Sequence, residues 1–168
     1  PALAPDLLAS PLHFNVSHTD GLVVCLVSTE HEVGVDVELF SRAPKLLELA
    51  PTVFAPRERA ALAALPGAAQ AGRAVTLWTL KESYIKARGM GLALPLDGFA
   101  FHFADDQIRL DVAPALGDDG ARWQFHCQRL GAHCLSTALD CVGGQVAIEL
   151  VEFTGAASTD ASHATASR

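Results

Sequence analysis

The stretch VGVDVE, residues 33–38, alternates valines with a glycine and two acids, which is the pattern of a β-strand. Residues two apart on a strand share a face, so the valines should point to the core while Gly34, Asp36 and Glu38 point the other way. The two acids then lie about 6–7 Å apart at Cα, and their oxygens can converge on one cation. Gly34 would leave room beside them for a bulky ligand. A half-exposed strand with its acids in water is the commoner explanation of this pattern taken alone.

Two further strands are predicted directly before this stretch. LHFNVSHT (residues 12–19) reads as a strand that ends in a polar turn. LVVCLVS (residues 22–28) is a continuous apolar run, which is typical of a buried strand. Three short strands in succession predict an antiparallel meander.

A helical region follows these strands. The stretch APKLLELAPTVF (residues 43–54) predicts a short helix that breaks at Pro51, and a second helix should begin at Pro56, where proline suits a first helical turn. A loop containing proline and glycine then precedes the longest predicted helix, residues 73–88, which should end at Gly89.

The rest of the chain is predicted to form strands, followed by a tail. Five short stretches have strand-like sequence: residues 99–104, 107–113, 122–130, 133–140 and 145–153. Because helices and strands are segregated along the chain, the fold class is α+β, with an antiparallel sheet packed by the long helix. Residues 154–168 are small and polar and are expected to be a disordered tail.

Two charged residues stand out on the long helix. Glu82 and Lys86 are four residues apart, opposite the apolar core stripe, at a spacing where side chains meet. A surface ion pair is the simple explanation, but three apolar residues flank them on the same side: Val75, Trp78 and Ile85. Lys81 lies at the edge of this surface. A carboxylate between two lysines and beside an apolar wall is what a site for a metal ion and phosphates requires.

Composition limits the classes of partner. Half of the 168 residues are apolar, 18% are charged, and the formal net charge is −7. This charge argues against non-specific binding to nucleic acid or membranes. No segment approaches the about 18 apolar residues that span a bilayer. We therefore expect a cytoplasmic protein with neither a nucleic-acid nor a membrane partner.

The cysteines allow two interpretations. Cys127, Cys134 and Cys141 recur every seven residues, and a histidine precedes two of them, so a zinc site is conceivable. Tight zinc sites use closer pairs, which favours free thiols packed in apolar strands, Cys25 included.

The NVSH turn raises a third kind of chemistry. Ser17 and His18, with Asp20 nearby, contain the residue types of a hydrolase triad. Adjacent residues cannot easily form a nucleophile–base pair, and the GxSxG-type turn of many such enzymes is missing from the sequence. A serine hydrolase is therefore disfavoured.

Three motifs, in their order along the chain, resemble those of the 4′-phosphopantetheinyl transferases. They are FNVSH (residues 14–18), VGVDVE (residues 33–38) and LWTLKESYIKARGMGL (residues 77–92). The match is to the larger, surfactin-synthetase-activating type, which is marked by a G-x-D-x-E strand and a W-x-x-K-E-[SA]-x-x-K helix. The resemblance runs to about residue 94, and more weakly through the later strands. It implies the fold of that family.

The resemblance also implies an activity. Such an enzyme moves the 4′-phosphopantetheine arm of coenzyme A onto a serine of an acyl- or peptidyl-carrier protein and releases adenosine 3′,5′-bisphosphate. The matching residues are the Mg²⁺-binding acids Asp36, Glu38 and Glu82, and the coenzyme A contacts Ser17, His18, Lys81 and Lys86. Glu82, Asp36 and Lys86 are the expected catalytic residues, with Glu82 also a candidate to remove the serine proton. Glu58 matches a position near the site.

Larger members of that family consist of two similar halves, with the coenzyme between them. By this comparison residues 1–32 are the end of the N-terminal half, and residues 33–153 are the catalytic C-terminal half. Shorter members complete their site by forming trimers. Self-association, or a missing N-terminal segment, is therefore expected to complete the site here.

Two other functions stay open. A different Mg²⁺-dependent phosphotransferase or nucleotide hydrolase would use the same acids and lysines, although a P-loop or kinase motif is missing from the sequence. Comparing coenzyme A with ATP as substrate separates these enzymes. An inactive fragment that only docks carrier proteins would bind the carrier without consuming coenzyme A.

Overall fold

The computed structural model describes residues 12–104, 107–142 and 144–153, and the predicted tail lies outside these ranges. The strands within them are β1 (His13–Thr19), β2 (Leu22–Ser28), β3 (Val33–Leu39), β4 (Phe99–Ala104), β5 (Gln107–Val112), β6 (Trp123–Leu130) and β7 (His133–Asp140). The α-helices are α1 (Ala43–Val53), α2 (Pro56–Ala63) and α3 (Gly67–Arg88). None of these helices is long and apolar enough to cross a membrane. The α+β prediction is confirmed.

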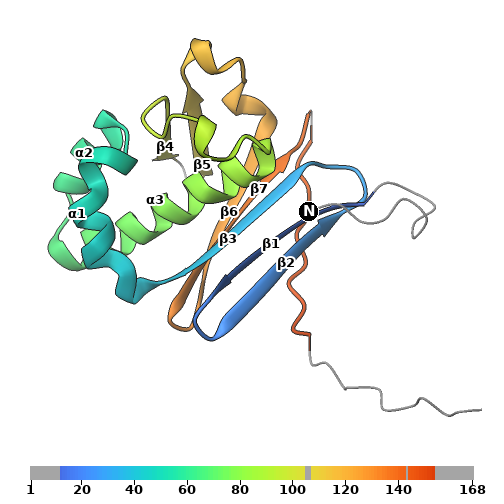
Figure 1. Ribbon diagram of the computed structural model, residues 1–168, viewed down its shortest axis with the longest axis horizontal. Helices are drawn as coiled ribbons and strands as arrows, with labels where there is room; N and C mark the ends of the chain where they lie inside the picture. The colour runs from blue at the N-terminus through green and yellow to red at the C-terminus, as the bar shows by residue number, and fades with distance from the viewer. Residues whose placement is uncertain (1–11, 105–106, 143, 154–168) are drawn as a thin grey trace, which may run out of the picture.

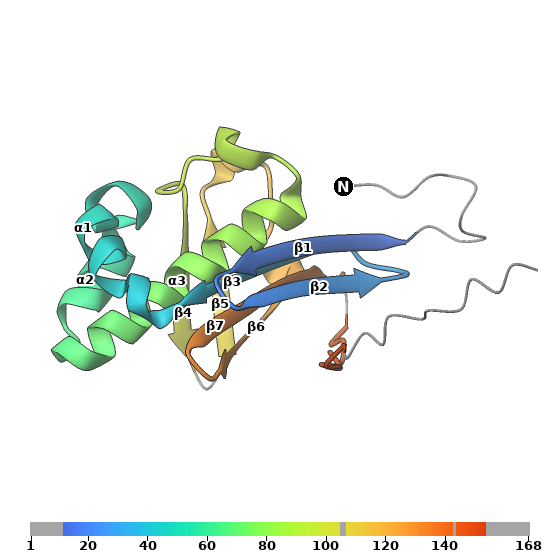
Figure 2. The ribbon, with the colours of Figure 1, turned by 60° about the horizontal axis from the view of Figure 1, so that its bottom comes forward.

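The strands form three antiparallel groups, in the orders β1–β2, β3–β7–β6 and β4–β5. The predicted meander is therefore wrong at its third strand, because β3 pairs with β7 and not with β2. Figure 1 shows α3 lying along the three-stranded group, with α1 and α2 at one end of it. The turned view in Figure 2 shows the β1–β2 hairpin beside β3.

Side chains, rather than a backbone ladder, attach β1 to β3 in the described part of the chain. The Oδ1 of Asn15 accepts a hydrogen bond from the backbone N–H of Val35 at 3.1 Å, and the Oγ of Ser17 accepts one from Val37 at 3.3 Å. These bonds satisfy two N–H groups on the edge of β3 that β7 does not cover.

Both faces of β3 are buried, which the alternating sequence did not indicate. Val35 and Val37 pack in a small cluster against β2, whereas the main core lies on the other face, under α3. On that face Gly34 touches the helix backbone: a Cβ added to it would lie 2.0 Å from the carbonyl oxygen of Ser83 and 2.6 Å from the nitrogen of Ala87. The space beside Gly34 is therefore filled by α3, not by a ligand.

The predicted helix boundaries need two corrections. α1 continues through Pro51, because the packing of its buried residues Leu46 and Val53 outweighs the one hydrogen bond that proline removes. α3 begins at Gly67, six residues before the expected start, because the alanines that follow it favour a helix. Its predicted end is confirmed: Gly89 adopts φ 64°, ψ 10°, the left-handed conformation that glycine takes readily.

Residues 145–153 form no strand, which contradicts the prediction. The side chain of Gln124 on β6 takes the place of a strand partner there. Its Nε2 donates to the carbonyl oxygen of Val146 at 2.6 Å, and its Oε1 accepts from the Val146 N–H at 2.7 Å. One glutamine side chain thus pairs with a single residue, and no ladder extends from it.

Replacing Gly34 by alanine should destabilise the protein strongly, because the new methyl group would meet the backbone of α3 and not a movable side chain. We expect Gly34→Ala to lower the free energy of unfolding by about 2–4 kcal/mol in urea denaturation. The control is Gly72→Ala within α3, where an added Cβ meets nothing within 4 Å. That control should be neutral or slightly stabilising. Equal stability of the two variants would contradict the close contact.

Candidate active site

Asp36 lies at the centre of a buried polar cluster that joins β1, β3 and α3. Its carboxylate is 6% exposed, and its Oδ1 accepts hydrogen bonds from the Nζ of Lys86 at 2.7 Å and from the Oγ of Ser17 at 2.9 Å. The Lys86 ammonium group also donates to Ser17 Oγ and to the carbonyl oxygen of Val35, both at 3.1 Å. The structure therefore brings one residue from each of the three sequence motifs into direct contact.

The acids of this cluster retain unused hydrogen-bonding capacity. Asp36 Oδ2 and Glu38 Oε2 are buried and have no hydrogen-bond partner among the described residues. The other oxygen of Glu38 forms an ion pair with Arg42 at 3.0 Å. A buried carboxylate oxygen without a partner is costly, so these two atoms fit a hydrogen-bond donor or a cation.

Burial raises the pKa of all three predicted acids. Desolvation is the largest cause for the pKa of Asp36, and it outweighs the opposing effect of Lys86. Desolvation is also the largest cause of the raised pKa of Glu38 and of Glu82, and the charge of Asp36 raises both pKa values further. The three carboxylates thus repel one another in a region with little water, an arrangement that a bound cation relieves.

The spacing of these acids sets a limit on metal binding by the protein alone. Within residues 12–104, 107–142 and 144–153, no three side chains of His, Cys, Asp or Glu are grouped closely enough to hold a metal ion by themselves. Mg²⁺ commonly uses only one or two protein carboxylates and completes its shell with water and substrate phosphates. The two unpartnered oxygens fit that partial ligand set.

Lys81 does not lie in this cluster, although the sequence predicted it to contact coenzyme A together with Lys86. Its side chain is 0% exposed and forms an ion pair with Glu58 at 2.9 Å. Its Nζ also donates to the carbonyl oxygens of Leu96 at 2.7 Å and Phe99 at 2.8 Å, so all three ammonium protons are used. One residue along a helix turns a side chain by 100°, which is enough to place Lys81 in the core while Glu82 stays at the site.

Glu58 has the same structural role. Its side chain is 0% exposed, accepts hydrogen bonds from the backbone N–H groups of Ala55 and Phe101, both at 2.8 Å, and pairs with Lys81. The carboxylate therefore closes the first turn of α2 and joins that helix to β4. Its predicted place near the acids is not observed.

The FNVSH strand divides between two faces. Ser17 is buried against Asp36, whereas His18 points to the opposite, exposed face of β1, across from Val23 on β2. The structure thus joins Ser17 to the acids and leaves His18 outside the cluster. Sequence reasoning missed Asn15. One feature of the sequence could have indicated it: Asn15 is a polar residue two positions before Ser17, so the two side chains lie on the same face of the strand.

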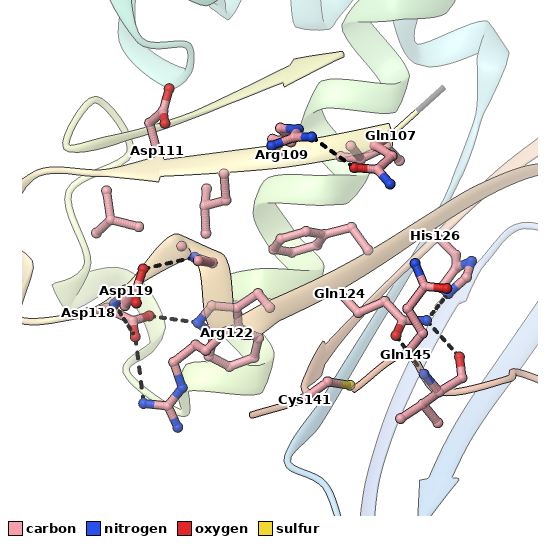
Figure 3. A pocket seen from close by; sticks show the side chains of 18 of the residues that line it. Gln107, Arg109, Asp111, Asp118, Asp119, Arg122, Gln124, His126, Cys141 and Gln145 are labelled. Carbon is pink, nitrogen blue, oxygen red and sulfur yellow. Dashed lines mark hydrogen bonds and ion pairs between the residues drawn. The ribbon is translucent and has the colours of Figure 1, made fainter. Parts of the chain in front are cut away.

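A groove of about 1180 Å³ lies elsewhere, between β5 and β6. Figure 3 shows Gln107, Arg109 and Asp111 on one side of it, with Gln124 and His126 on the other. None of the predicted site residues lines this groove. The candidate site rests on the buried acids and not on this groove.

The buried ion pair gives a direct test of the role of Lys81. Lys81→Met should lower the free energy of unfolding by about 3–5 kcal/mol, because it leaves the Glu58 carboxylate buried and without its cation. Lys45→Met is the control, since Lys45 forms an exposed pair with Glu48. We expect less than about 1 kcal/mol there. A Lys81→Met protein with unchanged stability and weakened coenzyme A binding would restore Lys81 to the ligand site.

Comparisons with known proteins agree with these motifs. The model of the 4′-phosphopantetheinyl transferase superfamily matches residues 32–138. A 4′-phosphopantetheinyl transferase of Bacillus subtilis is 39% identical over 103 residues, which are 61% of this chain and 45% of that protein. The 4′-phosphopantetheinyl transferase Sfp of Bacillus subtilis strain 168 is 37% identical over 109 residues, 64% of this chain and 46% of Sfp. The chain thus spans less than half the length of these relatives.

Solved structures show the same fold. A holo-(acyl-carrier-protein) synthase from Bacillus anthracis, in complex with CoA (3′,5′-ADP), gives a TM-score of 0.54 at 16% identity and covers 64% of this chain and 93% of its own. The synthase from Neisseria meningitidis gives 0.56 at 15% identity, with 64% and 95% covered. Taken together, the matched family model and the shared fold show that the chain belongs to the 4′-phosphopantetheinyl transferase superfamily.

Proposed function

We propose that this chain carries the metal- and pyrophosphate-binding part of an enzyme that transfers 4′-phosphopantetheine from coenzyme A to a serine of an acyl- or peptidyl-carrier protein. The observation that carries the proposal is the buried cluster of Asp36, Lys86 and Ser17, in which one oxygen of Asp36 has no partner among the described residues. Membership of the superfamily supports it. So does the coenzyme-bound relative of the same fold.

In this proposal Asp36 and Glu38 would hold Mg²⁺ with their unpartnered oxygens, and Glu82, which is not grouped with them closely enough, would have to move its side chain toward the ion. Bound there, the ion would neutralise charge on the pyrophosphate of coenzyme A and on the departing adenosine 3′,5′-bisphosphate. The unpartnered oxygens of Asp36 and Glu38, and the mutual repulsion of the acids, fit a hard cation. The nucleophile is the serine of the carrier, so the enzyme needs no nucleophile of its own.

Lys86 would bind a phosphate oxygen of coenzyme A. Its side chain is 27% exposed, and its ammonium group donates to Asp36, Ser17 and the Val35 carbonyl. Contact with a phosphate therefore requires it to exchange one of these three partners. Asp36 can release Lys86 once another cation compensates its charge, which makes that exchange favourable. Ser17 and His18 stay proposed contacts to coenzyme A.

Glu82 is also the proposed acceptor for the proton of the carrier serine. A raised pKa makes its carboxylate a better base near neutral pH than an ordinary glutamate. It lies on the same side of α3 as Lys86, so base and phosphate ligand are held by one rigid element. The position of the carrier serine then decides whether Glu82 takes its proton directly or through a water molecule.

The division into halves is likewise proposed, with residues 1–32 ending one half and residues 33–153 forming the other. The outer face of the β1–β2 hairpin supports it, since Val16, Val23 and Val27 there are 43%, 70% and 52% exposed. Contiguous exposed valines on a sheet favour a covering protein surface. Self-association or an added N-terminal half would provide one.

The activity is tested by incubating an apo carrier protein with coenzyme A, Mg²⁺ and the chain, and by measuring the mass of the carrier by mass spectrometry. The reaction is run with the chain alone and with a separate N-terminal half added. We expect the carrier to gain the phosphopantetheine mass. Asp36→Asn should reduce the rate about 10²-fold or more, whereas Lys45→Gln on the exposed face of α1 should not change it. Carrier binding without a mass gain would favour an inactive module that only docks carrier proteins. Turnover of ATP in place of coenzyme A would favour another phosphotransferase.

A second prediction concerns stability without metal. Because the folded protein resists ionisation of Glu82, its stability should fall as pH rises from the ordinary glutamate pKa through the raised one. Glu82→Gln removes that loss. In EDTA we expect its melting temperature to exceed that of the wild type at pH 8 and to equal it below the ordinary glutamate pKa. Millimolar Mg²⁺ should stabilise only the wild type. A variant less stable at pH 8 would show that ionised Glu82 is favourably paired.

A further inference from the structure

Two cysteines lie together beneath α3, on adjacent strands. The Sγ atoms of Cys127 on β6 and Cys134 on β7 are 3.5 Å apart. Cys127 stands directly opposite Ser136 in the β6–β7 register, so Cys134 is its diagonal neighbour on the same face. The sequence alone favours free, packed thiols at both positions. Their proximity gives them a chemistry that isolated thiols lack.

The two thiols differ in accessibility. Cys134 is 1% exposed and receives contacts from the hydroxyl groups of Thr79 at 3.5 Å and Thr76 at 3.8 Å. Cys127 is half-buried and lines the groove between β5 and β6, which is open to small molecules. One thiol can therefore meet a reagent from solution, while its neighbour is kept from solvent within the core.

Their ionisation differs in the same sense. The hydrogen bond with Cys134 is the largest cause that lowers the pKa of Cys127, and the hydroxyls of Ser136 and Thr76 and the charge of Arg73 act in the same direction. The same hydrogen bond raises the pKa of Cys134, which keeps its proton. An accessible thiolate beside a shielded thiol is the usual arrangement of an attacking and a resolving cysteine.

We propose that Cys127 and Cys134 are a reversible dithiol–disulfide pair that hydroperoxides oxidise. The Cys127 thiolate attacks the peroxide, the O–O bond breaks, and the leaving oxygen takes a proton and departs as water or an alcohol. Cys134 then attacks the resulting sulfenic sulfur, an S–S bond forms, the S–O bond breaks, and the hydroxyl leaves as water with the Cys134 proton. The two sulfurs together lose two electrons, and the peroxide gains them.

Forming this bond requires the two strands to shift, because diagonal neighbours on paired strands are commonly farther apart than the Cα atoms of a disulfide. A disulfide has an S–S length of about 2.05 Å, so the sulfurs must approach by about 1.5 Å. β6 is an outer strand of its group in the described structure, and the β6–β7 turn contains Gly131 at φ 58°. An edge strand held by one neighbour can move by that distance at a lower cost than a central strand.

The test uses the full chain, reduced and then treated with hydrogen peroxide before free thiols are alkylated. Cleavage after Arg129 separates Cys127 from a peptide that holds both Cys134 and Cys141, so a disulfide appears as a linked pair of peptides, about 2 Da lighter than their reduced sum, and fragmentation of the pair shows which of the two cysteines is bonded. We expect this pair, its loss on treatment with dithiothreitol, and no linkage through Cys141. Linkage through Cys25 alone, or both thiols remaining reduced when Cys25 is oxidised, would overturn the proposal.

Serine variants assign the two roles. Cys134→Ser should leave Cys127 as a sulfenic acid that dimedone traps, whereas Cys127→Ser should leave Cys134 reduced. Cys25→Ser, on the exposed face of β2, is the control and should still form the internal disulfide. Alkylation of Cys127 in the folded protein should become about tenfold faster between pH 5 and pH 7, because its hydrogen bonds lower the pKa of this thiol to about 6. The larger increase that a thiol of ordinary pKa shows over this range would remove Cys127 as the attacking group.

Discussion

The backbone contact between β3 and α3 at Gly34 is the constraint on which the candidate site depends. With no side chain at that position, the carbonyl of Ser83 and the nitrogen of Ala87 lie where a Cβ would otherwise be. The strand and the helix are therefore closer than ordinary side-chain packing allows. Their polar residues, Asp36 on one element and Lys86 on the other, reach each other directly across this short gap. A wider separation would leave both groups in water.

Helix α3 carries two lysine–acid pairs with different functions. The pair of Lys81 and Glu58 is closed, since every donor of the lysine and both oxygens of the acid have partners. It joins α3 to α2 and β4 and belongs to the framework. In the pair of Lys86 and Asp36, by contrast, one carboxylate oxygen has no partner within the part of the chain that the structure describes. Unused capacity of this kind distinguishes a binding site from a buried structural ion pair.

Much of the fold follows from local sequence. Periodicity predicted the strands up to residue 140, and Gly89 marked the end of α3. Strand pairing was harder to predict, because β3 pairs with β7, about a hundred residues away. The alternation of residues along a strand does not indicate which other strand it will pair with. The prediction of a strand at residues 145–153 was wrong for a related reason, because the side chain of Gln124 forms the hydrogen bonds that a partner strand would form there.

Motif spacing predicted the acids and Lys86 but could not separate Lys81 from them. Neighbouring helical residues diverge by a fixed angle, so placing Lys81 required knowing where the acid Glu58 of α2 would lie. That information is tertiary. The Asn15 contact was missed for the same reason: a polar residue on an edge strand shows its purpose only when the neighbouring edge is known.

Ser17 has a consequence for how ligand binding relates to the attachment of the hairpin. Its hydroxyl donates to Asp36 and accepts from Val37 and Lys86, which uses its one proton and both lone pairs. A ligand that hydrogen-bonds to this hydroxyl must displace one of these partners, and one of them holds β1 to β3. Occupancy of the site and docking of the hairpin are therefore linked equilibria. A protein surface that binds the outer face of β1 and β2 would then change the affinity of a ligand that binds beside Ser17 and Asp36. By the same linkage, that ligand would change the affinity of the hairpin for the protein surface.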